Sequence, residues 1–289
     1  MRLGIIGMGH VGRAMAGLFS PFADLVTYDQ TQGDTYPEAE LRRCAFAMVC
    51  VGTPMHADGS CDFTQVETAI ERLPLERVLL RSTVPPGTTD RLAAVSGKQV
   101  CFCPEYFGES SYLSNFHAGG PSSVPFMIVG GPPSARRTII DDLSSMMGPD
   151  KTYFQCSARE AEIIKYMENS YLAMKVTFVN EFFEICRTFD ADWHAVREGW
   201  LLDPRVERSH TGVFVAARGF SGRCLPKDVS AIIEASKAAG YAPQLLEEVM
   251  VSNRRFQTLS VDSSPALDEP LPGDTSQSRR PNTRARRLM

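Results

Sequence analysis

The chain has 289 residues, of which 43% are hydrophobic and 22% are charged, which is typical of a soluble globular protein with one large or two modest domains. Its formal net charge is −4, but residues 274–289 hold five arginines and one aspartate, so the preceding body carries −8. A negatively charged body gives no reason to expect nucleic acid as the main partner.

The chain begins Met1-Arg2-Leu3-Gly4-Ile5, which reads as a strand and not as a signal peptide. Its longest uncharged run, at about 118–135, is broken by prolines and glycines, so we expect no membrane span. The eight cysteines are scattered singly, and no His/Cys set has the spacing of a metal site. We therefore expect reduced thiols, no bound metal and a cytoplasmic location.

A glycine-rich turn, Gly7-Met8-Gly9-His10-Val11-Gly12, follows the first predicted strand at 3–6 and leads into a predicted helix at 13–19. A strand, Gly-x-Gly-x-x-Gly and a helix in this order are the context that a dinucleotide fingerprint requires. In that motif Gly7 allows the tight turn, Gly9 the approach of the pyrophosphate, and Gly12 the close packing of helix on strand. A turn that is only structural is the alternative.

A second predicted strand, at 25–28, ends in Asp29, 22 residues after Gly7. At this position a carboxylate accepts hydrogen bonds from the adenosine ribose. Gln30 and Thr31 follow, with no arginine to bind a 2′-phosphate. The sequence therefore predicts NAD, and not NADP, as the cofactor.

Predicted strands and helices then alternate up to residue 156, which indicates an N-terminal Rossmann-type domain, residues 1–156, with a doubly wound α/β sheet. Polar side chains follow the strands at 45–51, 77–81 and 99–103. The carboxyl ends of parallel strands share one edge of a sheet, where ligands gather. The side chains predicted to meet there are those of Thr53, Ser82, Thr83 and Glu105.

From 157 to about 189 apolar residues recur at helical spacing without glycine or proline. A helix of about 30 residues would span about 45 Å. We interpret it as the spine of a helical domain, residues 157–256, and as the interface of a homodimer. Lys165 and Asn169 are four residues apart and share a face of this helix, as catalytic groups or as a solvated pair.

The segment Gly219-Phe220-Ser221-Gly222-Arg223-Cys224-Leu225-Pro226-Lys227-Asp228 places one thiol behind a glycine turn, with a lysine and a carboxylate close behind. A nearby cation lowers the pKa of a thiol, which favours the nucleophilic thiolate. A buried cysteine beside a surface turn is the alternative. Helices are predicted at 229–239 and 243–255, and the composition of residues 257–289 predicts a disordered tail.

Taken together, these motifs resemble the UDP-glucose/GDP-mannose dehydrogenase family, over a match that runs from Met1 to about Phe256. The family oxidises a primary alcohol of a nucleotide sugar to a carboxylate with two NAD per turnover. The resemblance implies a catalytic cysteine that passes through a thiohemiacetal and a thioester. The segments that carry it are the glycine-rich fingerprint, Gly52-Thr53-Pro54, Ser82-Thr83-Val84-Pro85, Pro104-Glu105, the Lys165/Asn169 helix and Cys224-Leu225-Pro226-Lys227-Asp228.

The same resemblance implies a role for each matching residue. Cys224 would attack the aldehyde, and Lys165 with Asn169 would stabilise the developing oxyanion. Asp228, helped by Thr83, would position or deprotonate water, and Glu105 would assist thioester hydrolysis. NAD would be held by Gly7, Gly9, Gly12, Asp29, Thr53, Ser82 and Lys227.

Three departures from the family pattern concern the substrate. The family usually continues into a third, UDP-binding domain, whereas here Val251-Ser252-Asn253 is followed by the predicted tail, so we expect that domain to be lacking. Ser221 and Arg223 crowd the cysteine loop, and the run from Tyr106 to Ser110 loses an arginine that the family has. We therefore expect a nucleotide sugar or a related nucleoside as substrate.

Two other functions fit the sequence. A β-hydroxyacid dehydrogenase also joins a Rossmann domain to a helix with Lys and Asn four apart, but it needs no cysteine and makes one NADH per substrate. A non-catalytic NAD-binding remnant, acting as a scaffold or sensor, would need neither chemistry nor turnover.

Overall fold

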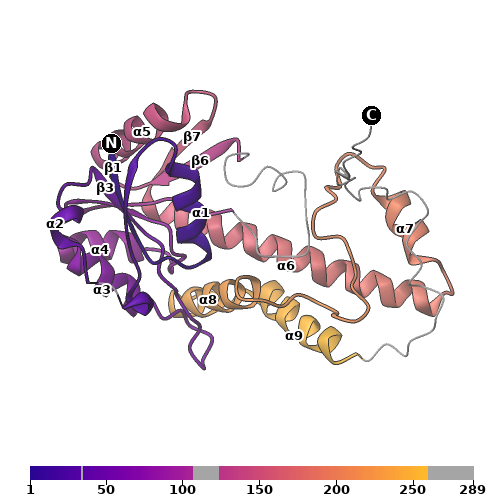
Figure 1. Cartoon of the computed structure of the whole chain (residues 1–289). Coiled ribbons are helices and arrows are strands. Elements are labelled where there is room, and N and C mark those ends of the chain that lie inside the picture. Colours follow the sequence, from indigo (N-terminus) through magenta and orange to yellow (C-terminus); the bar gives the residue numbers. More distant parts are fainter. Residues whose placement is uncertain (34, 107–123, 260–289) are drawn as a thin grey trace, which may run out of the picture. The chain divides into compact units, whose positions relative to one another are not determined.

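The computed structural model describes residues 1–33, 35–106 and 124–259 (Figure 1). Residues Met1–Leu259 form one compact unit. Its strands are β1 (Arg2–Ile6), β2 (Asp24–Tyr28), β3 (Phe46–Val49), β4 (Arg77–Leu80), β5 (Gln99–Phe102), β6 (Phe126–Gly130) and β7 (Thr152–Cys156). Its helices are α1 (His10–Phe19), the 3-10 turn η1 (Gln30–Gln32), α2 (Glu38–Leu41), α3 (Thr64–Arg72), α4 (Thr88–Ser96), α5 (Pro133–Met147), α6 (Ala158–Thr188), α7 (Trp193–Trp200), α8 (Leu225–Ala238) and α9 (Gln244–Thr258).

All seven strands belong to one sheet, in the order β2-β1-β3-β4-β5-β6-β7. Every neighbouring pair is parallel except β5 and β6. Ile5 of β1 pairs with Thr27 of β2 on one side and with Met48 of β3 on the other. The strand order therefore reverses direction at β1, and in such sheets the ligand crevice lies outside the carboxyl ends of the two strands that flank the reversal. The predicted doubly wound α/β fold is confirmed.

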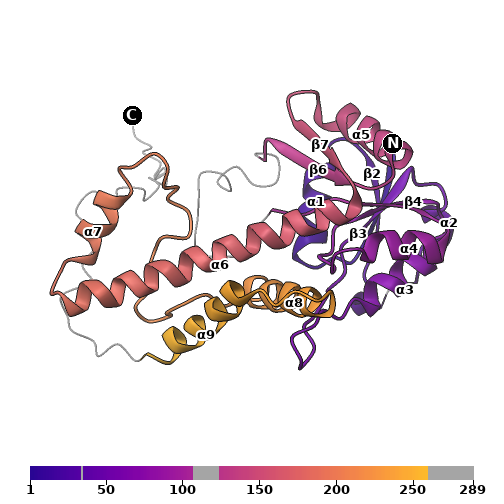
Figure 2. The same cartoon turned by 180° about the vertical axis from the view of Figure 1, so that it is seen from behind.

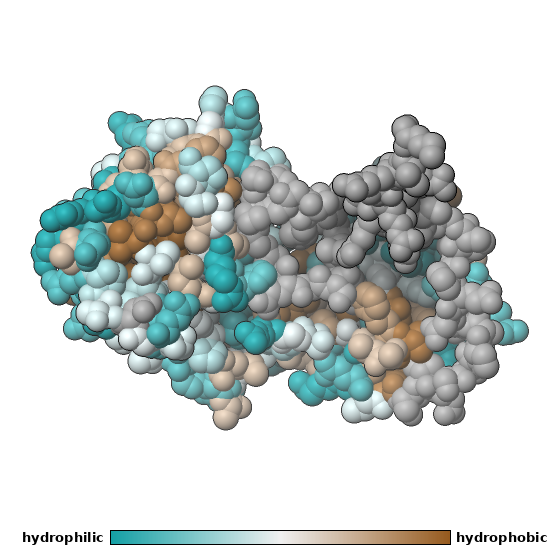
Figure 3. Space-filling view, viewed as in Figure 1, coloured by the Kyte–Doolittle hydropathy of each residue, from teal (hydrophilic) through white to brown (hydrophobic). Residues whose placement is uncertain are grey.

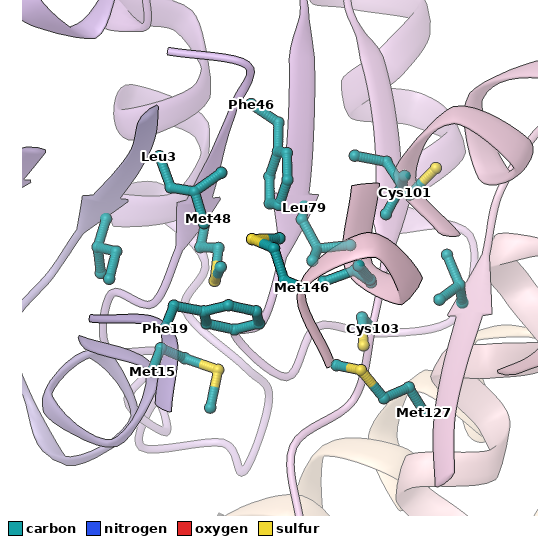
Figure 4. Close-up of a cluster of buried hydrophobic side chains, with 14 of the residues drawn as sticks. Leu3, Met15, Phe19, Phe46, Met48, Leu79, Cys101, Cys103, Met127 and Met146 are labelled. Atoms are coloured by element: carbon teal, nitrogen blue, oxygen red, sulfur yellow. The ribbon is translucent and has the colours of Figure 1, made fainter. Parts of the chain in front are cut away.

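Helices cover both faces of this sheet, because the side chains of each strand alternate between two cores. On one face, Met15 and Phe19 of α1 and Met146 of α5 pack with Phe46 and Met48 of β3 (Figure 4). Complete burial of side chains of this size contributes about 1.5–3 kcal/mol each. The core of the other face is closed by α3, α4 and the start of α6, which contribute Val66, Ile70, Leu92 and Ala161.

The long helix predicted at 157–189 is confirmed as α6, which has 31 residues. Its start is fixed by a capping box, in which Ser157 and Glu160 accept hydrogen bonds from each other's backbone N–H. Helices α8 and α9 run beside α6 in both views (Figures 1 and 2). Apolar residues join the three helices in a core of their own, formed by Ala173, Val176, Phe220, Val229, Ile233 and Val249.

Some element boundaries differ from the sequence predictions. Helix α8 begins at Leu225, four residues before the predicted start, because Pro226 lies in the first turn, where its fixed φ suits a helix and its missing N–H is not needed. Lys227 and Asp228 therefore stand on the first turn of a helix. Helices α4 and α7 were not predicted, and α9 continues to Thr258, so it includes the first two residues of the predicted tail.

Two sequence predictions concern residues outside the described ranges: the departure at 107–110 and the tail from 260 onward. Within the described ranges, no helix combines the length and the apolar character needed to cross a membrane. No group of three or more His, Cys, Asp or Glu side chains among the described residues has an arrangement suited to a metal ion.

Candidate active site

The glycine-rich turn has the backbone geometry that the fingerprint requires. Gly7 has φ +91°, and a Cβ there would lie 2.8 Å from the carbonyl oxygen of Cys50. At Gly12 a Cβ would lie 1.8 Å from the carbonyl oxygen of Gly7, so only glycine permits this packing. A Cβ at Gly9, in contrast, would meet nothing within 4 Å. The open side of the turn is thus at Gly9, where the fingerprint places the pyrophosphate, next to the N-terminus of α1.

Asp29 follows β2 and lies beside this turn. Its carboxylate accepts hydrogen bonds from Met8 N at 2.7 Å, from Thr31 N at 2.9 Å and from Thr31 Oγ1 at 2.6 Å. The hydrogen bonds from Thr31 are the main reason why the pKa of Asp29 lies below its ordinary value. Asp29 is therefore an ionised acceptor at the edge of the turn, as binding of a ribose requires. These residues fit an NAD molecule.

The predicted residues at the strand ends lie at one edge of the sheet. Ser82, after β4, donates to the carbonyl oxygen of Val51 at 2.7 Å, which joins the ends of β3 and β4. The carbonyl oxygen of Thr83 is 3.9 Å from the sulfur of Cys61, which donates to it. Burial raises the pKa of Cys61, while the nearby Lys227 and a hydrogen bond with Thr53 lower it. The buried thiol of Cys61 thus connects this edge to the first turn of α8.

Cys224 occupies the N-cap position of α8, and its carbonyl oxygen accepts the hydrogen bond from Asp228 N at 2.9 Å. It is the one exposed cysteine among the eight. A thiol at a helix N-terminus lies where the helix dipole favours negative charge. Its place in the fold agrees with a nucleophile more than with a core cysteine.

Lys165 reaches from α6 to the end of β5. Its ammonium donates to the carbonyl oxygen of Glu105 at 2.6 Å and lies 5.2 Å from the centre of the Tyr106 ring. The side chain is buried, with 6% of the residue exposed. The solvated alternative for Lys165 is therefore wrong.

Asn169, one turn further along α6, donates to Asp228 Oδ2 at 2.5 Å. The other carboxylate oxygen of Asp228 forms an ion pair with Lys227, whose ammonium also donates to Thr53 Oγ1 at 3.4 Å. Asp228 is 2% exposed and Asn169 is 5% exposed. A buried carboxylate needs such partners, because an unpaired one would cost several kcal/mol.

The charged side chains that act on the Cys224 thiol are Asp228, Lys165, Glu105 and Lys227. Withdrawal of the thiol from water is the largest influence and raises its pKa, and the Asp228 carboxylate raises it further. Lys165 and Lys227 act in the opposite direction but are outweighed. The expectation that the lysines lower the pKa of Cys224 below its ordinary value is therefore wrong.

Asn253 of α9, which the sequence analysis did not assign to the site, holds the segment that leads to Cys224. Its side chain accepts from Phe220 N at 2.7 Å and donates to Phe220 O at 2.9 Å. The preceding residue, Gly219, has φ +73°, and a Cβ there would lie 2.4 Å from Asn253 Oδ1. A polar residue on the same helix face as Val249 and Phe256, which are buried, was the signal that could have identified Asn253.

Comparison with known proteins agrees with these features. The model of the UDP-glucose/GDP-mannose dehydrogenase family, NAD binding domain, matches residues 22–119, and that of the central domain of the same family matches residues 159–255. UDP-glucose 6-dehydrogenase TuaD of Bacillus subtilis is 30% identical over 235 residues, which are 77% of this chain and 49% of TuaD. UDP-glucose 6-dehydrogenase of Pseudomonas aeruginosa is 27% identical over 310 residues, 90% of this chain and 66% of that protein. The chain thus spans about half to two thirds of the length of these relatives.

Two solved structures share the fold of this chain. A UDP-glucose dehydrogenase from Pyrobaculum islandicum superimposes with a TM-score of 0.75 at 27% identity and covers 88% of this chain and 68% of that one. A 3-hydroxyisobutyrate dehydrogenase from Mycobacterium tuberculosis has a TM-score of 0.61 at 14% identity and covers 88% and 93%. At that identity the second comparison shows a shared fold alone.

Proposed function

The chain belongs to the UDP-glucose/GDP-mannose dehydrogenase family and carries its NAD-binding domain, and on this basis we propose that it oxidises a primary alcohol of a nucleotide sugar, or of a related nucleoside, to a carboxylate. The oxidation removes four electrons. It consumes one water and two NAD and releases two NADH and three protons.

The observation that carries the proposal is the set of charges around one thiol. The side chains of Lys165, Glu105, Lys227 and Asp228 all act on Cys224, although they come from α6, the end of β5 and the first turn of α8. The sequence motifs predict that these four residues belong to one site. A cysteine of an exposed residue position, surrounded by two buried and two partly buried ionisable groups, is an arrangement suited to covalent catalysis.

The residues at the carboxyl ends of β1 and β2 would hold the adenosine half of NAD: Gly7, Gly9 and Gly12 through their backbone, and Asp29 through its carboxylate. When bound, NAD supplies the hydride acceptor for both oxidations. Thr53 and Ser82 follow the neighbouring strands β3 and β4, and Lys227 of α8 donates to Thr53; we assign these three residues to the remaining parts of NAD.

Cys224 acts after the first oxidation, when its sulfur loses its proton and forms a bond to the aldehyde carbon. The carbonyl oxygen gains a proton and becomes the hydroxyl oxygen of a thiohemiacetal. Loss of a hydride and of the hydroxyl proton turns this adduct into a thioester. The buried ammonium of Lys165, with the amide of Asn169, stabilises the negative charge that develops on the oxygen. One fixed donor at such an oxygen lowers the barrier by about 3 kcal/mol.

Water then cleaves the carbon–sulfur bond of the thioester, which gives the carboxylate and returns the thiol. Asp228 takes the proton from this water, and Thr83 and Glu105 position it. Asp228 then passes this proton to the departing sulfur, which leaves as the thiol.

The proposal is tested by incubating the purified protein with NAD and a panel of nucleotide sugars and nucleosides that bear a primary alcohol. Two NADH per substrate consumed are expected, and Cys224→Ala is expected to stop before the carboxylate. Cys156→Ala, which removes a half-buried thiol of β7, is the matched control and is expected to leave the stoichiometry unchanged. Tight NAD binding without turnover of any compound would favour the non-catalytic reading.

The β-hydroxyacid dehydrogenase hypothesis is the second candidate, because a 3-hydroxyisobutyrate dehydrogenase shares the fold of this chain. It predicts a different outcome of the same experiment. One NADH would form per substrate, and Cys224→Ser would be fully active.

We further propose that α6 forms the interface of a homodimer. Six large apolar side chains of α6 are 39–73% exposed and recur every three to seven residues, so they form one stripe along the helix: Ile163, Met167, Tyr171, Phe178, Phe182 and Ile185. Contiguous exposed apolar surface of this kind marks an interaction site. A second copy of the same helix is a suitable partner for such a stripe.

A further inference from the structure

Glu162 is a buried carboxylate that none of the chemical steps above uses. It lies on α6, three residues before Lys165, and is 0% exposed. Burial raises its pKa above the ordinary value, although several hydrogen bonds oppose this effect. A carboxylate kept at such a cost calls for a structural or functional reason.

The hydrogen-bond donors to Glu162 come from the loop between β4 and α4. Gly87 N donates to Oε2 at 2.5 Å, and Thr89 donates to Oε1 through its N–H at 2.8 Å and through Oγ1 at 2.6 Å. Gly87 is the N-cap residue of α4 and has no side chain to cap the helix. Glu162 therefore caps α4 from a helix that is 73 residues away in the sequence.

The loop held in this way is the one that carries Ser82 and Thr83, whereas the turn of α6 that follows Glu162 carries Lys165. Gly87 has φ +91°, and a Cβ there would lie 3.6 Å from the guanidinium of Arg159, on the first turn of α6. The loop thus lies directly on the start of α6. One carboxylate therefore joins the start of α6 to the loop that carries Ser82 and Thr83, two residues assigned to the proposed site.

We propose that Glu162 is a positioning residue, which fixes the register between α6 and the β4–α4 loop and so sets the place of the Lys165 ammonium beside Cys224. The effect of Glu162 on catalysis rests on the proposed function, whereas its effect on the position of Lys165 does not. A purely structural cap would stabilise the fold by about 0.5–2 kcal/mol and would leave Lys165 where it is.

The two roles differ in what they do to the reactivity of Cys224. Lys165 lowers the pKa of this thiol, while Asp228 and Glu105 raise it and Lys227 lowers it. Glu162 is not among the main groups that shift the pKa of Cys224, and removal of a negative charge would lower that pKa, so slower alkylation would report the displacement of Lys165. Displacement of Lys165 would raise the pKa of Cys224 and slow its alkylation.

Glu162→Gln tests the proposal, because the amide nitrogen of glutamine cannot accept the hydrogen bond from Gly87 N. We expect iodoacetamide to modify Cys224 about threefold more slowly at pH 8, as a shift of half a pKa unit would produce, measured by mass spectrometry of the peptide. Glu160→Gln is the matched control, since this exposed carboxylate of the same helix accepts its hydrogen bonds from the capping residue Ser157 and none from the β4–α4 loop among the described residues. It is expected to leave the alkylation rate unchanged.

An unchanged alkylation rate in Glu162→Gln, together with a lower melting temperature, would overturn the proposal and show that Glu162 only caps helix α4. Should Glu162→Gln not fold, Thr89→Val decides, because it removes one donor and keeps both backbone N–H groups. It is expected to slow alkylation in the same direction, and an unchanged rate contradicts the proposal. The wild-type protein also separates this question from the function: absence of turnover would refute the proposed reaction, whereas alkylation would still report on Glu162.

Discussion

At the scale of single residues, the pKa of the Cys224 thiol is set by opposing influences. Withdrawal from water and the Asp228 carboxylate keep its pKa high, and the ammonium groups of Lys165 and Lys227 lower it. Because little of it is in the thiolate form, this thiol reacts slowly until one of the nearby charges changes. Binding of a cofactor with a cationic ring, or protonation or removal of Asp228, would favour the thiolate.

Asp228→Asn is expected to make Cys224 more reactive, because it removes a negative charge that raises the pKa of the thiol. Lys165→Met is expected to have the opposite effect. At neutral pH, below the pKa of the thiol, alkylation should be about three- to tenfold faster in the first variant and slower by a similar factor in the second. The measurement is the rate of Cys224 alkylation between pH 6 and pH 10.

Lys237→Met provides the control for this series. Lys237 lies near the other end of α8, where it pairs with Glu234 and Glu247. Equal rates in all variants, or a slower reaction in Asp228→Asn, would show that these charges do not govern the thiol.

At the scale of elements, local patterns in the sequence predict the sheet and the long helix well. The glycine-rich turn, the strand ends and α6 have short-range signals that act within one or two turns of chain. The start of α8 has a local signal too, because Pro226 suits the first turn of a helix, but the sequence analysis places Pro226 in a loop. Lys165, Asn169 and Asp228 were assigned through motifs, and their hydrogen bonding follows from how α6 and α8 pack.

The role of Glu162 could not be read from the sequence. Glu160, Glu162 and Glu168 all lie in the first third of α6, and nothing local separates the buried one from its neighbours. The difference arises from the β4–α4 loop, which needs a cap that its own residues do not supply. The same holds for Asn253, whose partner Phe220 lies 33 residues earlier in the chain.

Asn253→Leu is expected to destabilise the protein, because it leaves the buried N–H of Phe220 without its hydrogen bond. The carbonyl of Phe220 loses one of two hydrogen bonds and keeps the one from Gln257. An unsatisfied buried group costs about 1–3 kcal/mol, so we expect the free energy of unfolding to fall by about that amount. Urea unfolding at neutral pH measures it. Ser252→Ala, the preceding residue of α9, is the control, and an unfolding midpoint of Asn253→Leu equal to that of the control would contradict the account.

At the scale of the whole molecule, the division of residues 1–156 and 157–256 into two domains stays a prediction, since Met1–Leu259 form one compact unit. The exposed apolar surface of α6 bears on whether the protein forms a homodimer. Hydrophobic surface is visible in Figure 3 in the region where Figure 1 draws the C-terminal half of α6. Among the described residues, the exposed apolar side chains of α6 lie on the side opposite to its contacts with α8.

Phe182→Glu is expected to weaken the proposed homodimer, because it places a charge within the apolar stripe. Light scattering at increasing protein concentration should give the mass of a dimer for the wild-type protein and a shift toward the monomer for the variant. Val95→Glu introduces the same charge at an exposed position of α4 and should leave the mass unchanged. A monomeric wild-type protein at all concentrations would exclude the interface.

The central claim is that one thiol carries the substrate between two oxidations. The most direct test counts the NADH formed per substrate consumed in the wild-type protein and in Cys224→Ser. Our account predicts two NADH for the wild-type protein and a reaction in Cys224→Ser that stalls before the carboxylate. One NADH per substrate in both proteins, at equal rates, would contradict it.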